Sequence, residues 1–204
     1  QGLYQLNLTK RDIKRLFPRT QYKSMQTFTF TPDGDTIICS DDNGQASNCT
    51  KPNMYYALRS EGFRKIRPYA YGPCTYSTVC MPNGTKFYAS WTNAAIYRQE
   101  PEGRQIPFAD ENRTKCFTLA QISQIDGAHI RLVMHPAHKY VYIIAPQIRC
   151  ILRSNYNAQT NMLEYPTVVA GNFSQGGFAE GTGGAARFGT LWCGIFVKNQ
   201  DYVN

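Results

Sequence analysis

The segment Met25-Gln-Thr-Phe-Thr-Phe30, continued by Pro32-Asp-Gly34 and Thr36-Ile-Ile-Cys39, decides the fold class. Polar and apolar side chains alternate in the first run, and Pro-Asp-Gly separates it from the second. Proline presets φ for a turn and glycine accepts the left-handed conformation, so the pattern predicts a β-hairpin.

A second hairpin is predicted between His129 and Ala145. Ile130, Leu132 and Met134 share one face of the first strand, and residues 136–139 supply the turn. Further strand-like stretches lie at residues 86–97, 148–152, 162–170 and 187–197. Many short strands separated by turns favour an antiparallel sheet architecture.

One short helix is expected near the N-terminus. Thr9 to Asp12 resembles a weak capping box, Ile13 and Leu16-Phe17 are apolar, and Pro18 ends the segment. No internal repeat of about 34 or 40 residues is visible, which disfavours solenoids and propellers. The prediction is a mainly β, single-domain antiparallel sandwich or barrel over residues 1–204, with one short N-terminal helix and stabilising disulfides.

Composition agrees with a folded domain. Hydrophobic residues make up 42% of the 204 residues and aromatic residues 13%, which suffices for a core. Charged residues make up only 18%, which argues against disorder.

Seven cysteines suggest an oxidising compartment. Zinc sites need Cys-x2-Cys pairs, whereas the closest cysteines, Cys74 and Cys80, have five residues between them, so no metal is expected. Disulfides are predicted instead, with Cys39–Cys49 and Cys74–Cys80 as candidate local bridges. The odd cysteine would be free, or bonded to a partner chain or to sequence outside this chain. The cysteines are Cys39, Cys49, Cys74, Cys80, Cys116, Cys150 and Cys193.

Five Asn-x-Ser/Thr sequons point to the same compartment. Chance predicts roughly 1.5 sequons in a chain of this composition. We therefore predict an N-glycosylated domain that is secreted or on the extracellular face of a membrane or virion, excised from a larger ectodomain or beginning at a cleaved mature N-terminus. The predicted glycosylation sites are Asn7, Asn48, Asn83, Asn112 and Asn172.

The net charge of +8 bears on the partner. In an extracellular protein this charge favours anionic glycans or acidic protein surfaces over nucleic acid. A tyrosine-rich stretch overlaps one basic cluster, and tyrosine and arginine often anchor interfaces. The alternative is that these tyrosines line the core. The predicted ligand-binding residues are Tyr55, Tyr56, Arg59, Arg64, Lys65, Arg67, Tyr69, Tyr71 and Tyr76.

Other candidate sites have weaker support. His129, His135 and His138 could serve a hydrolase together with a loop carboxylate, although their spacing fits a polar hairpin tip better. The segment 176–189 contains a Gly-x-Gly pattern, but a strand-like stretch follows it where a dinucleotide site needs a helix, so no cofactor is expected. Glu180 and Arg187 interrupt the same segment, so direct membrane insertion is not expected, and a flexible loop that contacts a ligand is favoured.

The combined hypothesis is a non-enzymatic extracellular binding domain of a secreted, cell-surface or viral envelope glycoprotein. Its partner would be a host receptor protein or an anionic glycan. A secreted hydrolase and a structural domain of a larger assembly, bridged through the odd cysteine, are the alternatives.

Overall fold

The computed structural model describes residues 2–18, 25–41, 52–71, 74–99, 114–122 and 127–196. These residues form fifteen strands and two short 3-10 helices. The strands are β1 (Gly2–Asn7), β2 (Asp12–Pro18), β3 (Met25–Phe30), β4 (Thr36–Asp41), β5 (Pro52–Leu58), β6 (Arg67–Tyr71), β7 (Thr75–Cys80), β8 (Lys86–Ser90), β9 (Ala95–Gln99), β10 (Lys115–Thr118), β11 (Arg131–Met134), β12 (Tyr140–Ile144), β13 (Cys150–Asn157), β14 (Met162–Leu163) and β15 (Thr167–Gly171). The 3-10 helices are η2 (Arg59–Glu61) and η5 (Gly183–Ala185).

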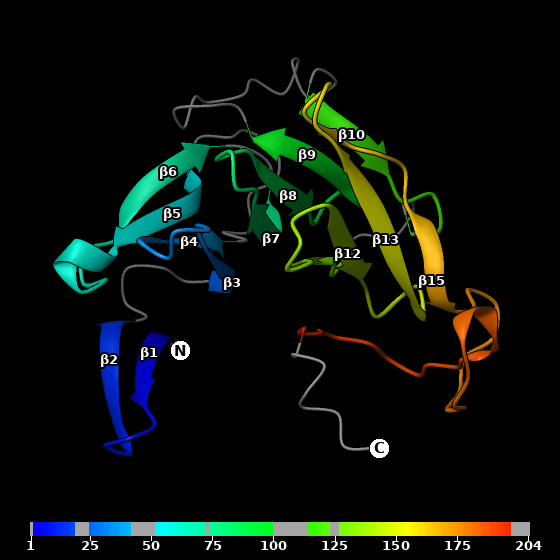
Figure 1. The fold of residues 1–204 in the computed structure, drawn as a ribbon, viewed down its shortest axis with the longest axis horizontal. Coiled ribbons are helices and arrows are strands. Elements are labelled where there is room, and N and C mark those ends of the chain that lie inside the picture. Colours follow the sequence, from blue (N-terminus) through cyan, green and yellow to red (C-terminus); the bar gives the residue numbers. More distant parts are fainter. Residues whose placement is uncertain are drawn as a thin grey trace.

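Twelve of the strands form three successive antiparallel sheets, which we call blades 1 to 3. Their strand orders are β3-β4-β5-β6, β7-β8-β9-β10 and β11-β12-β13-β15, and the short β14 pairs with the far end of β13. The blades follow one another around an arc (Figure 1), and the first strand of blade 2, β7, contacts β3 and β11 on either side. Successive four-stranded blades whose first strands lie innermost are the architecture of a β-propeller. The predicted mainly β, antiparallel fold is confirmed. Neighbouring sheets pack face to face, as the sheets of a sandwich do. The three sheets together form an open arc.

The first hairpin turn of each blade is the same turn. In all three, the N–H of the fourth turn residue donates to the carbonyl oxygen of the first, at 2.7, 2.9 and 2.8 Å. The fourth residue has positive φ each time, with values of 73°, 85° and 56°. The donor and acceptor pairs are Gly34 with Thr31, Gly84 with Met81, and His138 with His135. The blades are therefore an internal repeat of structure without a visible sequence period, and the expectation that a propeller-like architecture is disfavoured is wrong.

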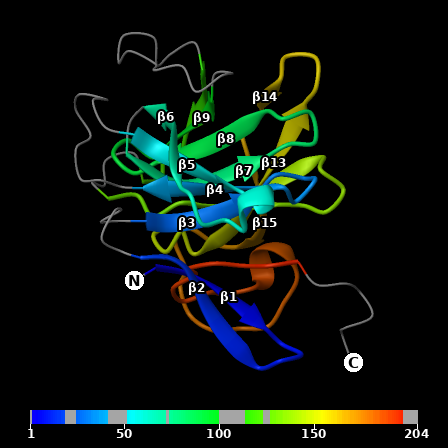
Figure 2. The same ribbon diagram turned by 90° about the vertical axis from the view of Figure 1, so that its left-hand side faces the viewer.

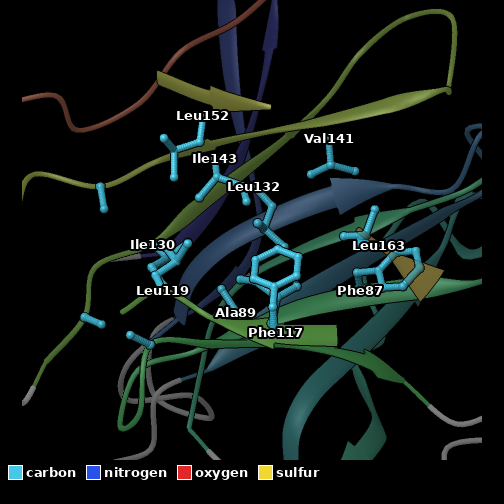
Figure 3. Close-up of a cluster of buried hydrophobic side chains, with 14 of the residues drawn as sticks. Phe87, Ala89, Phe117, Leu119, Ile130, Leu132, Val141, Ile143, Leu152 and Leu163 are labelled. Atoms are coloured by element: carbon cyan, nitrogen blue, oxygen red, sulfur yellow. The ribbon is translucent and has the colours of Figure 1, made fainter. Parts of the chain in front are cut away.

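Blade 2 is buried on both faces because it has a blade on each side. Along β8, Phe87 and Ala89 belong to the cluster shared with blade 3, whereas Tyr88 belongs to the cluster shared with blade 1. Figure 3 shows Phe87 and Ala89 opposite Leu132 and Ile143 of blade 3. This explains why every residue of β7 is buried instead of every second one.

The predicted N-terminal helix is wrong, because its residues form a strand. β2 pairs with β1 along its whole length in an antiparallel hairpin. The Oδ1 atom of Asn7 accepts the backbone N–H groups of Thr9 and Lys10 at 3.1 and 3.0 Å, which stabilises the turn. Figures 1 and 2 both place this hairpin and residues 172–196 on the open side of the arc.

None of the predicted disulfides forms among the six described cysteines. Cys74 and Cys80 lie at opposite ends of extended strand β7, so their Cα atoms are about 20 Å apart, whereas a disulfide allows at most about 7 Å. Cys39 is a buried thiol within β4, and Cys49 lies outside the described residues. Cys39 and Cys150 instead belong to the apolar clusters of the core.

The three described sequons share one conformation. The side-chain oxygens of Asn7, Asn83 and Asn172 each accept the backbone N–H two residues on, at 3.1, 3.1 and 3.0 Å. Such Asx turns favour Asn followed by small polar residues, so turn chemistry also accounts for an excess of sequons. Glycosylation stays a prediction, and Asn48 and Asn112 lie outside the described residues.

The glycine-rich segment 176–189 forms a tight loop closed by a bridge between Ala179 and Arg187. The Nη1 atom of Arg187 donates to the carbonyl oxygens of Gly184 and Ala186, which fixes the loop internally. Phe178, which precedes the bridge residue Ala179, is 94% exposed. The strand predicted over residues 187–197 is not found in its described part, because in residues 187–196 only Arg187 takes part in a β-bridge. No helix within the described part of the chain is long and apolar enough to cross a membrane.

Candidate functional site

An open groove of about 430 Å³, which we call the outer groove, lies between blades 1 and 2. Tyr56 of β5 and Tyr69 of β6 form one wall, with ring centroids 6.2 Å apart and planes at 78°. Ile38, which pairs with Tyr56 across the sheet, is buried at the base of this wall. The groove is lined by Thr31, Thr36, Ile38, Tyr56, Leu58, Pro68, Tyr69 and Lys86. Two aromatic surfaces with a few polar groups are typical of small-molecule sites.

Lys86 at the start of β8 brings a positive charge to the outer groove. Its Nζ lies 5.1 Å from the centroid of the Tyr69 ring and donates to the carbonyl oxygen of Gly84 at 2.9 Å. It has no carboxylate partner within the described ranges. An ammonium has three N–H donors, so two remain for a ligand.

Arg67 holds the side of the outer groove in place. Its Nη1 and Nη2 atoms donate to the two carboxylate oxygens of Glu61 at 2.7 and 2.6 Å, and its Cζ lies 5.8 Å from the Tyr56 centroid. These hydrogen bonds hold the pKa of Glu61 below its ordinary value. The arrangement orients Tyr56 and leaves Lys86 as the unpaired cation of this groove.

The remaining predicted ligand residues do not line the outer groove. Arg59 pairs with Asp35 at 3.4 Å, and Arg64 and Lys65 are exposed on the connection between β5 and β6. Tyr55 precedes Tyr56 on β5 and so faces the other side of the sheet. The other two predicted residues also lie elsewhere. The side chain of Tyr71 is outside the described part, and Tyr76 lies on β7.

A second groove of about 510 Å³, the inner groove, follows the first strands of the three blades. Its lining residues are Gln26, Thr27, Phe28, Thr29, Ser77, Thr78, Val79, Arg131, Leu132, Val133, Met134, Cys193, Gly194 and Ile195. Arg131 carries the only formal charge among these residues of the described chain. Its Cζ lies 4.0 Å from the ring centroid of Tyr76, which is 5% exposed.

A column of stacked rings begins at Tyr76, over which the Arg131 guanidinium lies. The Tyr76 and His129 rings stack at 4.9 Å with planes 7° apart, and His129 and Trp91 stack at 6.1 Å and 13°. Trp192 lies against His129 at 5.6 Å and is 52% exposed. The buried Nε1 of Trp91 has no hydrogen-bond partner among the described residues. Tyr76 therefore lies in this column and apart from the other predicted ligand residues. The column could not be predicted from local patterns, because its members come from four separate segments.

The three histidines do not converge. His129 precedes β11 and His135 follows it, so they lie at opposite ends of the strand. His135 packs against Phe196 at 4.9 Å, and His138 occupies the left-handed turn position. The described residues contain no group of three His, Cys, Asp or Glu side chains placed to hold a metal.

Solved structures from Bacteroides resemble this chain. An auxiliary nutrient binding protein from Bacteroides ovatus ATCC 8483 matches 98% of this chain and 44% of its own, with 25% identity and a TM-score of 0.79. An auxiliary nutrient binding protein from Bacteroides thetaiotaomicron VPI-5482 matches 92% of this chain and 41% of its own, with 25% identity and a TM-score of 0.73.

A third solved structure is similar to this chain in fold only. This Bacteroides thetaiotaomicron VPI-5482 protein, provisionally named a phosphatase, is 19% identical over all of this chain and 48% of its own, with a TM-score of 0.80. No protein-family model and no curated protein matches the chain. The chain spans less than half the length of each of these three structures, to which it is similar in fold.

Proposed function

We propose that this chain is a non-catalytic ligand-binding protein whose outer groove binds a sugar ring. The proposal rests on the rings of Tyr56 and Tyr69, which are nearly perpendicular to each other. They lie beside the Lys86 ammonium in a groove of about 430 Å³. A sugar has apolar C–H faces that pack on aromatic rings and hydroxyl groups that accept hydrogen bonds from an ammonium. The volume lies within the usual range of about 300–1,000 Å³ for small-molecule sites.

Two further observations support binding over hydrolysis. The described lining of the outer groove has no carboxylate, histidine or thiol to act as acid, base or nucleophile. Two structures that are 25% identical over more than nine-tenths of this chain are described as auxiliary nutrient binding proteins. Neither description mentions a viral envelope or a receptor, so the proposed partner is a nutrient-type small molecule rather than a host receptor.

The extracellular location and the glycans remain part of the proposal. The sequons still support them, although no disulfide forms among the six described cysteines. Mass measurement of the protein from its native source before and after enzymatic deglycosylation would decide whether the sites are occupied.

The test is calorimetric titration with glucose, galactose, N-acetylglucosamine and maltotriose. At least one of these sugars should bind, and Tyr69→Ala should weaken it by about tenfold or more, because it removes one aromatic wall. Lys86→Met should weaken it as well, whereas Tyr4→Ala, which removes an exposed tyrosine on the β1–β2 hairpin, should not. Wild-type affinity in Tyr69→Ala and Lys86→Met, or failure of all four sugars to bind, would contradict the proposal.

A further inference from the structure

Arg131 is a cation without an anion. It is half-buried in the inner groove, and no carboxylate pairs with it anywhere in the described ranges. The groove lining contributes hydroxyl, thiol and apolar groups but no acidic side chain among the described residues. Half-buried charges are ordinarily compensated, so the missing partner points to a ligand.

The guanidinium is held in a fixed orientation. Its Nη1 donates to the backbone oxygen of Tyr76 and its Nη2 to the Tyr76 hydroxyl, both at 3.1 Å. The Tyr76 ring beneath it is clamped by His129. A guanidinium has five N–H donors, so three remain beyond the two that Tyr76 uses. A preorganised fork of this kind matches the two oxygens of a carboxylate or phosphate.

Ser77 adds a second donor beside Arg131. Its Oγ accepts the backbone N–H of Leu132 at 3.0 Å, which ties β7 to β11 next to the guanidinium. The hydroxyl proton has no acceptor among the described residues, so it can point at a ligand. Burial also lowers the pKa of Arg131 below its ordinary value, because withdrawal from water disfavours the charged form.

We propose that the inner groove is an oxyanion site, in which Arg131 and Ser77 bind the carboxylate or phosphate of a small organic ligand. The exposed Trp192 ring, which precedes the lining residue Cys193 in the chain, offers a surface for the body of that ligand. Ser77 belongs to blade 2 and Arg131 to blade 3, and the inner groove shares no lining residue with the outer groove. It stands whether or not the outer groove binds sugars.

The test compares three probes of similar size by calorimetric titration at low ionic strength: glucuronate, glucose 6-phosphate and glucose. At least one of the two anions should bind about tenfold or more tightly than glucose, and about 0.5 M salt should weaken it. Arg131→Met should abolish this preference. Arg131→Lys keeps the charge but loses the fork, so it should retain only part of it. The anion that binds identifies the class as carboxylate or phosphate.

Two control variants separate this site from other effects. Arg64→Met removes an exposed arginine of blade 1 and should leave anion binding unchanged, as should Tyr69→Ala in the outer groove. If Arg131→Met fails to fold, as judged by circular dichroism, Arg131→Lys and Ser77→Ala decide the question. Equal affinity for the three probes, or wild-type anion affinity in the folded Arg131 variants, would overturn the inference.

Discussion

Gly84 and Gly171 both have positive φ, of 85° and 93°, but their surroundings differ. A Cβ atom at Gly84 would meet no atom within 4 Å, so alanine there costs only conformational strain. A Cβ at Gly171 would collide with the backbone carbonyl of Arg149, and it would lie 2.9 Å from the Cα of Cys150. Backbone atoms of a paired strand cannot give way as a flexible side chain can.

We expect Gly84→Ala to lower the free energy of unfolding by about 1–2 kcal/mol. Gly171→Ala should cost about 3 kcal/mol or more, because the collision adds to the same strain. Urea denaturation of both variants measures the difference. Equal losses would mean that β15 can shift away from β13 without penalty.

Cys39 gives the protein a dependence on alkaline pH. Burial raises the pKa of this thiol from 9.0 to about 12. Between these values the unfolded chain releases the thiol proton and the folded chain keeps it, so stability falls as pH rises above about 9. We expect urea denaturation at about pH 8 and pH 10.5 to show a shallower pH dependence for Cys39→Ala than for the wild type. Parallel pH profiles of the two proteins would contradict this assignment.

At the scale of elements, local sequence patterns were sufficient to predict two of the hairpins. Pro32 to Gly34 and the runs around it define β3 and β4, and the predicted hairpin from His129 to Ala145 contains β11 and β12. The N-terminal hairpin was missed because Thr9 to Asp12 also satisfies a helix-capping pattern. Pairing with β1 decides the outcome, and a local pattern carries no information about that partner.

The repeat was missed because the blades share a geometry more than a sequence. Only the proline at positions 32, 82 and 136 is common to the three turns, and glycine at the left-handed position is replaced by His138 in the third. Tyr56 and Tyr69 of the proposed outer-groove site could be predicted together because they lie close together in the chain. Lys86 and Arg131 could not be predicted as part of these sites, because only the packing of one blade against the next brings them beside residues that are distant in sequence.

On the scale of the whole molecule, the two seams between blades are unequal. The apolar cluster between blades 2 and 3 includes Phe87, Ile143 and many neighbours (Figure 3), whereas the cluster between blades 1 and 2 is small and centres on Ile38 and Tyr88. Each blade depends on its neighbour for a buried face, as in other repeat proteins. The seam between blades 1 and 2 is therefore the weaker of the two.

We expect native-state hydrogen exchange to show lower opening free energies for β4 and β5 than for β12 and β13. Ile38→Ala should lower the opening free energy of β4 and β5 by about 2–4 kcal/mol and leave that of β12 nearly unchanged. Ile143→Ala, an equally buried isoleucine in the larger cluster, should lower protection in β12 and β13. One common opening free energy for all these strands would mean that the blades unfold as a single unit.

The outer groove lies across the weaker of the two seams. Tyr56 and Tyr69 belong to blade 1 and Lys86 to blade 2, so a molecule in this groove touches both sides of the seam. A ligand that binds only the closed arrangement adds its binding free energy to the cost of separating the blades. A bound ligand would then hold blades 1 and 2 together reversibly, so the rigidity of blade 1 would depend on the concentration of the ligand.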